Sequence, residues 1–238
     1  MVALRAERRR ALRVTAAFAI RFATAPLAVA FASARTDWPA HPTLTWWAID
    51  RPTLVLGSAQ PATTVDAPAA AAAGVEVVRR ASGGGAVLLD PRDVVWADLV
   101  IPPGHPRWDD DVIAAARWVG DAWVEALVAL GLPADTLACH HGGLVRSRWS
   151  DSICFAGLGP GEVRVAGRKV VGISQRRTRA GVRFQIAVLR RWDPVGIVAL
   201  LALDDAARAS AVDAIAGLAV GVPFGADALQ AAFSAVIA

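Results

Sequence analysis

The chain has 238 residues, of which 55% are hydrophobic and 19% charged, and its formal net charge at pH 7 is +4. This composition is typical of a globular domain with a sizeable core, and it excludes a disordered chain. Apart from an arginine-rich beginning, the basic residues are dispersed, so the sequence predicts no nucleic-acid-binding patch.

The first residues superficially resemble an export signal, because residues 1–13 are rich in arginine and residues 14–34 are apolar. However, Arg21 interrupts the apolar stretch, which is therefore neither a clean signal core nor a membrane span. We expect an amphipathic first helix or strand instead. The chain has only two cysteines, too few for a disulfide-stapled secreted fold, and we expect a reducing, cytoplasmic setting.

The first half of the chain is predicted to be rich in strands. Short β-branched or apolar runs are interrupted by Pro and Gly, and they predict strands over residues 44–50, 53–60, 74–80, 86–90 and 94–101. Residues 61–73, rich in Ala and Pro, are predicted to be a loop.

The clearest predicted helix follows Asp109-Asp110-Asp111, whose negative charge suits a helix N-terminus. Apolar residues then recur at helical spacing from Val112 to Leu130, and Gly131 and Pro133 end the pattern. The helix is amphipathic, so we expect it to lie on a sheet.

The second half is predicted to contain a loop over residues 140–151, followed by strands over 153–156, 162–165, 169–175 and 182–189. From Pro194 onward the pattern is helical to the end of the chain, with breaks near Asp204 and around residues 221–225. Strands gathered in one block with helices around them predict an α+β fold.

A glycine-rich break follows the predicted strand that ends in two arginines, in the run Arg79-Arg80-Ala81-Ser82-Gly83-Gly84-Gly85-Ala86-Val87. Glycines let the backbone approach a ligand closely, and their N–H groups can bind an anion. Arg80 could hold a phosphate or carboxylate through paired hydrogen bonds. Taken alone, the three glycines favour a flexible hairpin beside a surface arginine over a binding loop.

Lys169 is the only lysine among 25 basic residues, within Gly167-Arg168-Lys169-Val170-Val171-Gly172. Because every other basic side chain is an arginine, the one lysine that is retained is a candidate for chemistry that arginine cannot perform. The alternative is the chance survival of one surface lysine.

Cys154 is a candidate nucleophile, because a nearby cation can lower the pKa of a thiol. For an arbitrary cysteine, a buried structural role would be the alternative. Cys139, His140 and His141 could bind zinc together with Cys154, but their spacing fits no common zinc pattern, so we predict no metal site and treat the histidines as loop residues.

These motifs resemble the signatures of lipoate–protein ligases and octanoyltransferases. The arginine–glycine run, the Gly-Arg-Lys strand and the Leu-Gly-x-x-Gln ending at Gln60 occur in the family's order, and the resemblance covers roughly residues 52–194. It implies a mixed, largely antiparallel sheet flanked by helices, like the catalytic domain of biotin and lipoate ligases. We expect one such domain over residues 1–238, with its core at 44–193 and a helical tail at 194–238.

One octanoyltransferase branch carries a Cys-Phe dipeptide where this chain has Cys154-Phe155. The resemblance therefore implies that Cys154 and Lys169 are catalytic, and that an octanoyl or lipoyl group passes through a Cys154 thioester to a lysine. The binding residues that it implies are Arg80, Ser82, Gly83, Gly84, Gly85, Ala86, Val87, Leu88, Gly167 and Gly172. The implied partners are an acyl carrier protein and the lipoyl domains of 2-oxoacid dehydrogenases or the glycine cleavage H protein, without nucleic acid or membrane.

Two other functions stay open at this point. An ATP-dependent lipoate–protein ligase would bind ATP, lipoyl-adenylate and Mg²⁺ at Arg80, the glycines and Lys169, whereas a transferase needs no cofactor. A degenerate paralogue would bind an acyl group without turnover. That third hypothesis is motivated by Ile186, which stands where the family has a histidine and which we expect to point into the pocket.

Overall fold

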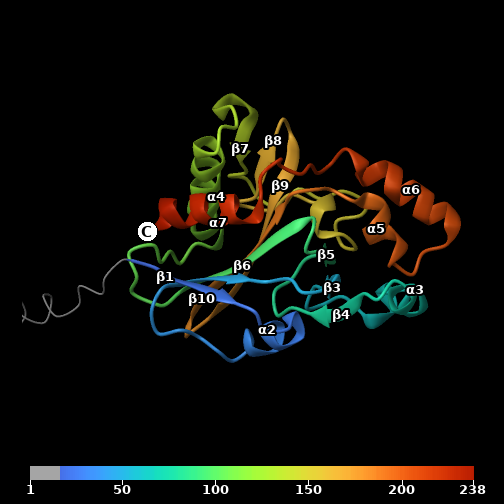
Figure 1. Cartoon of the computed structure of the whole chain (residues 1–238), viewed down its shortest axis with the longest axis horizontal. Helices are drawn as coiled ribbons and strands as arrows, with labels where there is room; N and C mark the ends of the chain where they lie inside the picture. Colours follow the sequence, from blue (N-terminus) through green and yellow to red (C-terminus); the bar gives the residue numbers. More distant parts are fainter. Residues whose placement is uncertain (1–16) are drawn as a thin grey trace, which may run out of the picture.

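The computed structural model describes residues 17–238, which form two β-sheets covered by helices (Figure 1). The larger sheet has seven strands, and its first pair is parallel while the other neighbours are antiparallel. Its strands, in spatial order, are β1 (Ala19–Ala23), β2 (Thr43–Trp47), β6 (Val94–Ile101), β10 (Gly181–Leu189), β9 (Arg168–Thr178), β8 (Val163–Val165) and β7 (Leu137–Cys139).

The smaller sheet has three strands in the order β4 (Glu76–Arg79), β3 (Thr53–Leu56) and β5 (Val87–Leu89). Strand β3 is parallel to β4 and antiparallel to β5. The arginine–glycine run connects β4 to β5, so this small sheet supports the glycine loop at both ends.

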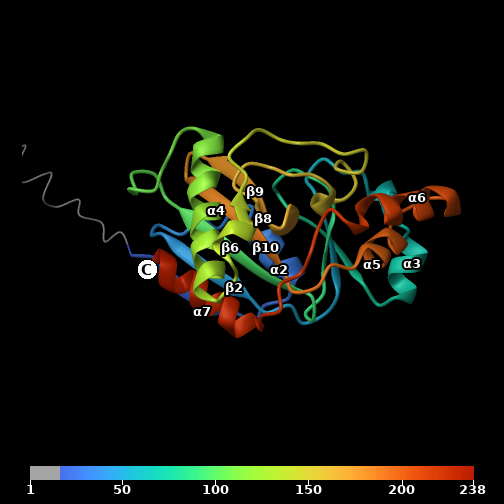
Figure 2. The same cartoon turned by 90° about the horizontal axis from the view of Figure 1, so that it is seen from above.

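Helices α4 (Val112–Ala129) and α7 (Ala226–Ile237) lie against one face of the larger sheet (Figures 1 and 2). Their interface is apolar, with the rings of Trp123 and Phe233 stacked at 4.2 Å between centroids. The helix predicted after the three aspartates is confirmed, and Asp111 caps it by accepting hydrogen bonds from two backbone N–H groups of its first turn.

The opposite face and the small sheet are covered by shorter helices. Helix α2 (Leu27–Ser33) packs into the core between the two sheets, where Phe31 meets the Trp96 ring edge to face. Beside the small sheet lie α3 (Ala67–Ala72), α5 (Pro194–Ala199) and α6 (Asp205–Ala216) (Figure 1). The predicted helices after Pro194, with breaks near Asp204 and residues 221–225, are thus confirmed as α5, α6 and α7.

The α+β class and the largely antiparallel sheet are confirmed, but the predicted loop over residues 61–73 is wrong. That segment forms a short 3₁₀ turn, η1 (Ala62–Thr64), and then α3. The Asp66 carboxylate accepts from the Ala69 N–H and caps α3, and Pro68 lies in its first turn, where a missing N–H costs nothing. A run of alanines, the best helix former, follows.

The predicted strand over residues 153–156 is also wrong. Only Ile153 forms a bridge, to Ala86, and the chain then turns into a 3₁₀ helix, η3 (Cys154–Ala156). Conversely, β7 and the 3₁₀ turn η2 (Ala134–Thr136) before it were not predicted, because three residues are too few to show a period.

The arginine-rich beginning, residues 1–13, lies outside the described residues. The described part of the apolar stretch that follows contains β1 and α2. Within residues 17–238, no helix combines the length and the hydropathy that a membrane span requires.

Candidate functional site

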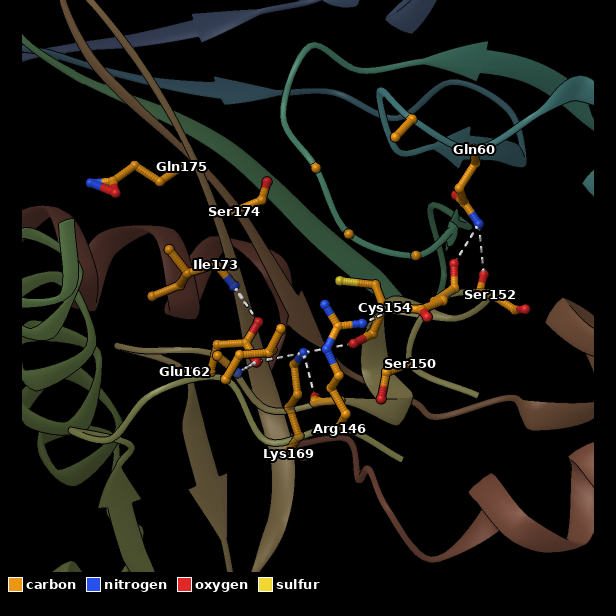
Figure 3. Close-up of a pocket in the computed structure, with 18 of the residues that line it drawn as sticks. Gln60, Arg146, Ser150, Ser152, Cys154, Glu162, Lys169, Ile173, Ser174 and Gln175 are labelled. Carbon is orange, nitrogen blue, oxygen red and sulfur yellow. Dashed lines mark hydrogen bonds and ion pairs between the residues drawn. The ribbon is translucent and has the colours of Figure 1, made fainter. Parts of the chain in front are cut away.

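A cavity of about 670 Å³ opens where strand β9 meets the glycine loop and the segment before β8 (Figure 3). Segments distant in the sequence meet around it: the connection after β3, the β4–β5 loop, residues 144–162 and β9. Of the residues that the sequence predicted as a site, five line this cavity, namely Gly83, Gly84, Gly85, Cys154 and Lys169.

Cys154 is held through its backbone at the cavity wall. Its N–H donates to the Ala86 carbonyl at 2.9 Å, and the Ala86 N–H donates to the Ser152 carbonyl at 2.8 Å. The Gln60 side chain adds two hydrogen bonds of 3.1 Å to the carbonyls of Asp151 and Ser152. Because all these bonds engage the backbone, the half-buried thiol itself is left facing the cavity (Figure 3).

Lys169 is almost completely buried, and its ammonium group has three partners. The Nζ atom donates to the carbonyls of Cys154 at 2.9 Å and Gly157 at 3.1 Å, and it forms an ion pair of 2.7 Å with Glu162 (Figure 3). The lysine therefore uses all three of its hydrogens. It fixes the turn that begins at Cys154 and places a positive charge beside it.

Glu162, which the sequence did not single out, holds Lys169 in place. Its carboxylate also accepts hydrogen bonds from the Gly159 N–H at 2.6 Å and the Ile173 N–H at 3.0 Å. A buried ion pair is tolerated only when its remaining polar atoms are bonded, and these two amides meet that condition. No local pattern marks Glu162, because its partner is brought to it by the pairing of β8 with β9.

Arg80 is buried behind the glycine loop rather than at the cavity surface. Its guanidinium donates to the carbonyls of Gly83 at 2.7 Å and Gly85 at 2.9 Å, and so holds the loop from inside. Burial lowers the pKa of the Arg80 guanidinium, and electrostatic interactions with Cys154 and Glu162 oppose that shift. Arg80 therefore adds a second buried positive charge near Cys154.

Close contacts or backbone shape require glycine at positions 57, 84 and 85. Gly84 has a φ of +94°, and a Cβ atom on Gly57 would lie 1.9 Å from the Gly84 carbonyl oxygen. A Cβ atom on Gly85 would lie 2.6 Å from the Ile153 backbone and 2.8 Å from the Cys154 nitrogen. Within residues 17–238, no hydrogen bond is found from the amides of Gly83, Gly84 or Gly85, so these N–H groups are available to an oxygen in the cavity.

Gly85→Ala is expected to slow the acyl transfer that the sequence resemblance implies by about 100-fold, because the new methyl group pushes away the peptide that carries Cys154, and a misplacement of about 1 Å costs this much in rate. Gly83→Ala is the matched control, since its Cβ would meet no atom within 4 Å. Transfer rates and melting temperatures of both variants check the prediction. Equal rates for the two variants would contradict it.

The other sequence-predicted residues surround the cavity without lining it. The Ser82 hydroxyl donates to Gln185 at 2.9 Å and lies 2.9 Å from the hydroxyl of Ser174, which does line the cavity. Ala86 bonds the Cys154 N–H through its carbonyl. Val87 is in the core between the sheets.

Leu88 packs against the cluster formed with α5 and α6. Gly167, with a φ of +80°, forms the turn from β8 to β9. A Cβ atom on Gly172 would lie 3.1 Å from the Phe155 ring, so this glycine makes room for the residue after Cys154.

The expectation that Ile186 points into the pocket is wrong. Ile186 is 0% exposed, lies in the buried cluster that contains Val119 and Trp123 of α4, and does not line the cavity. Its neighbour Gln185 faces Ser82 instead, and adjacent residues of a strand point to opposite faces of the sheet. The isoleucine is therefore a packing residue.

Ile186→His is expected to destabilise the protein by about 3 kcal/mol, because an imidazole without a hydrogen-bond partner would replace an aliphatic side chain in the core. Ile186→Val, which removes one methyl group, should cost only about 1 kcal/mol. Urea unfolding of both variants provides the measurement. A histidine variant that gains transfer activity without losing stability would show that the side chain reaches the site after all.

Further polar residues at the cavity were not predicted. Ser174 and Gln175 come from β9, and Ser150, Asp151 and Arg146 come from the segment that was predicted as a loop. The exposed Arg146 pairs with Asp151 at the rim. Loop residues such as these carry no periodic signal by which the sequence could have selected them.

Comparison with known families shows that residues 27–221 match the lipoyl protein ligase A/B catalytic domain. An octanoyltransferase LipM from Kyrpidia tusciae is 34% identical over 176 residues, which are 73% of this chain and 63% of the relative. A second, from Moorella thermoacetica, is 32% identical over 60% of this chain and 51% of the relative. The chain thus spans less than two thirds of the length of these relatives.

Solved structures show the same fold at low sequence identity. A bipartite lipoate protein ligase from Thermoplasma acidophilum has a TM-score of 0.72 at 18% identity, with 92% of this chain and 82% of that chain covered. A lipoate-protein ligase A bound with ATP has a TM-score of 0.65 at 19% identity, covering 91% and 82% of the two chains. The expected likeness to the catalytic domain of lipoate ligases is confirmed for the fold.

Proposed function

Because the chain belongs to the lipoyl protein ligase A/B catalytic domain family, we propose that it transfers an octanoyl or lipoyl group to the acceptor lysine of a lipoyl domain through a thioester on Cys154. The observation that carries this proposal is the meeting of Cys154, Lys169 and the glycine amides at one cavity. The similarity to two octanoyltransferases supports octanoyl as the group transferred.

In the first step, the Cys154 thiolate attacks the thioester carbonyl of an acylated acyl carrier protein. The new carbon–sulfur bond forms as the carrier's thiolate leaves, and that thiolate takes up the proton that Cys154 lost. Lys169 and Arg80 place two buried positive charges near Cys154. We assign stabilisation of the oxyanion to the amides of Gly83, Gly84 and Gly85, which line the cavity.

In the second step, the amine of a lipoyl-domain lysine attacks the Cys154 thioester. An amide bond forms, the carbon–sulfur bond breaks, and the amine gives up a proton as the Cys154 thiol is regenerated. The exposed residues 144–148, of which Leu144 and Arg146 line the cavity, form the surface over which the lysine would enter. The route consumes no ATP and needs no metal, and an amide is more stable than a thioester, which drives the transfer.

Two features weigh against the other hypotheses. A ligase would use Arg80 for phosphate, but its guanidinium is turned to loop carbonyls and does not line the cavity. The degenerate paralogue was motivated by Ile186, which lies in the core and leaves the site unchanged. Both hypotheses remain outcomes of the experiment that follows.

The test is intact-mass analysis of the protein after mixing with octanoyl-acyl carrier protein. We expect a gain of one octanoyl group that hydroxylamine removes, followed by its transfer when a lipoyl domain is added. Acylation of the lipoyl domain only from free lipoate and ATP would identify a ligase. Binding of the acyl group without a covalent gain or transfer would identify a non-catalytic protein.

A further inference from the structure

Three metal-binding side chains meet outside the cavity, at the contact between α4 and the end of β7. They are Asp121 on α4, Cys139 at the last position of β7, and His141 two residues later. Their ligand atoms all lie within 4.8 Å of one another, and none of the three residues lines the cavity. Two of these atoms, His141 Nε2 and an Asp121 carboxylate oxygen, are 2.9 Å apart.

We propose that Asp121, Cys139 and His141 form a binding site for a divalent transition-metal ion, with Zn²⁺ as the expected occupant. A thiolate, an imidazole and a carboxylate are the three ligand types that zinc takes in proteins, and a thiolate disfavours Mg²⁺ and Ca²⁺. The fourth tetrahedral position would hold water, because His141 and Asp121 are exposed. This donor set differs from the Cys139, His140, His141 and Cys154 set considered from the sequence.

The two omitted donors have other places. Cys154 lies at the cavity, and the His140 ring bonds the Gly143 carbonyl at 2.7 Å. Successive side chains of an extended segment point to opposite sides, so Cys139 and His141 lie on one side and His140 on the other. Helix α4 supplies the third ligand, Asp121. The site thus needs a helical residue 18 positions before Cys139, which spacing alone could not reveal.

The backbone around the three ligands is held in position. Arg117, one turn before Asp121, donates from its guanidinium to the His141 carbonyl at 3.0 Å, and its own carbonyl accepts the Cys139 thiol at 3.6 Å. Gly120 allows this close packing, since a Cβ atom there would lie 2.6 Å from Cys139 Sγ and 2.0 Å from the Gly161 carbonyl oxygen. These contacts hold α4 and the end of β7, which carry the ligands, against each other.

The donor set of the cluster favours a cation. The Asp121 carboxylate, the Cys139 sulfur and the His141 ring nitrogen all lie within 4.8 Å of one another, so an ion between them would meet one negative ligand and two further electron-pair donors.

A metal here would fix the start of the cavity wall. His140 lies between the ligands Cys139 and His141. Its N–H donates to the Glu162 carbonyl at 2.8 Å, and the His140 carbonyl accepts from the Gly161 N–H at 2.8 Å. Glu162 is the ion-pair partner of Lys169, and the chain beyond His141 carries Leu144 and Arg146 to the cavity. We expect metal binding to stabilise this wall, with a rise in melting temperature.

The experiment titrates Co²⁺, and then Zn²⁺, into the untagged, reduced full-length protein. We expect about one Co²⁺ per chain, with a near-ultraviolet sulfur-to-cobalt absorption band that Zn²⁺ abolishes. Cys139→Ser should remove the band, and His141→Ala and Asp121→Asn should each weaken binding by about 10-fold to 100-fold. Cys154→Ser and His140→Ala are the matched controls, and both should keep the band and the affinity.

Asp121 and His141 are exposed, so replacing either one leaves the core intact. A loss of metal binding in these two variants can therefore be separated from a loss of folding. Absence of a sulfur-to-cobalt band in the wild-type protein would overturn the proposal. A band that persists in Cys139→Ser and disappears in Cys154→Ser would also overturn it, since the metal would then lie in the cavity. Neither result depends on acyl transfer, so the metal site and the proposed function stand or fall separately.

Discussion

Cys154→Ser is expected to reduce acyl transfer to a lipoyl domain by at least about 1,000-fold, because the hydroxyl that replaces the thiol is ionised far less readily at neutral pH. The acyl-enzyme should no longer appear in the intact mass after incubation with octanoyl-acyl carrier protein. The substitution exchanges one small side chain for another at a half-buried position, so the fold and the cavity should be unchanged. Rates under single-turnover conditions provide the measurement.

Cys139→Ser is the matched control for this variant, because it removes the other thiol, which does not line the cavity. It should keep transfer near the wild-type rate in metal-free buffer. Equal, ATP-dependent lipoylation by the wild type and by Cys154→Ser would contradict the thioester route and support a ligase.

Lys169→Arg is expected to reduce transfer by roughly 100-fold to 1,000-fold, although the positive charge is retained. The ammonium group sits between the carbonyls of Cys154 and Gly157 and the Glu162 carboxylate, at 2.7 to 3.1 Å from each. The larger, planar guanidinium cannot make these three contacts in the same space, so the turn that carries Cys154 should shift. We expect loss of acyl-enzyme formation as well as of the overall transfer.

Arg168→Lys is the matched control, since it makes the reverse exchange at the exposed neighbouring position. It should leave the transfer rate within about two-fold of the wild type, as surface substitutions usually do. Melting temperatures would separate a local effect of Lys169→Arg from global unfolding. Wild-type transfer by a folded Lys169→Arg variant would rule out a role for the ammonium group at this site.

The elements that the sequence predicted well are those whose signal is local. Helix α4 was predicted from its aspartates, its helical period and the glycine that follows, because capping and amphipathicity depend only on neighbours in the chain. Strand β6 has the predicted bounds, residues 94–101. Helix α3 was missed because its proline and its alanines were interpreted as loop residues, although Asp66 caps it.

The sequence by itself determined the family signatures and the two candidates for chemistry. Lys169 stood out as the sole lysine and Cys154 through its place before the Gly-Arg-Lys run, both of which are properties of the linear chain. The structure then brings both residues to one cavity, and their catalytic roles stay predictions until the variants are measured.

Only the tertiary structure decided what these residues touch. Glu162 meets Lys169 because β8 pairs with β9. The carbonyls that accept from Arg80 are brought to it by the curvature of the glycine loop. Ile186 is buried because it lies on the face of β10 that packs with residues of α4. The cluster of Asp121, Cys139 and His141 likewise forms because Gly120 lets the helix approach β7. Each of these contacts joins segments that only the fold brings together. Strand register and packing decide which segments meet, and no local sequence pattern encodes them.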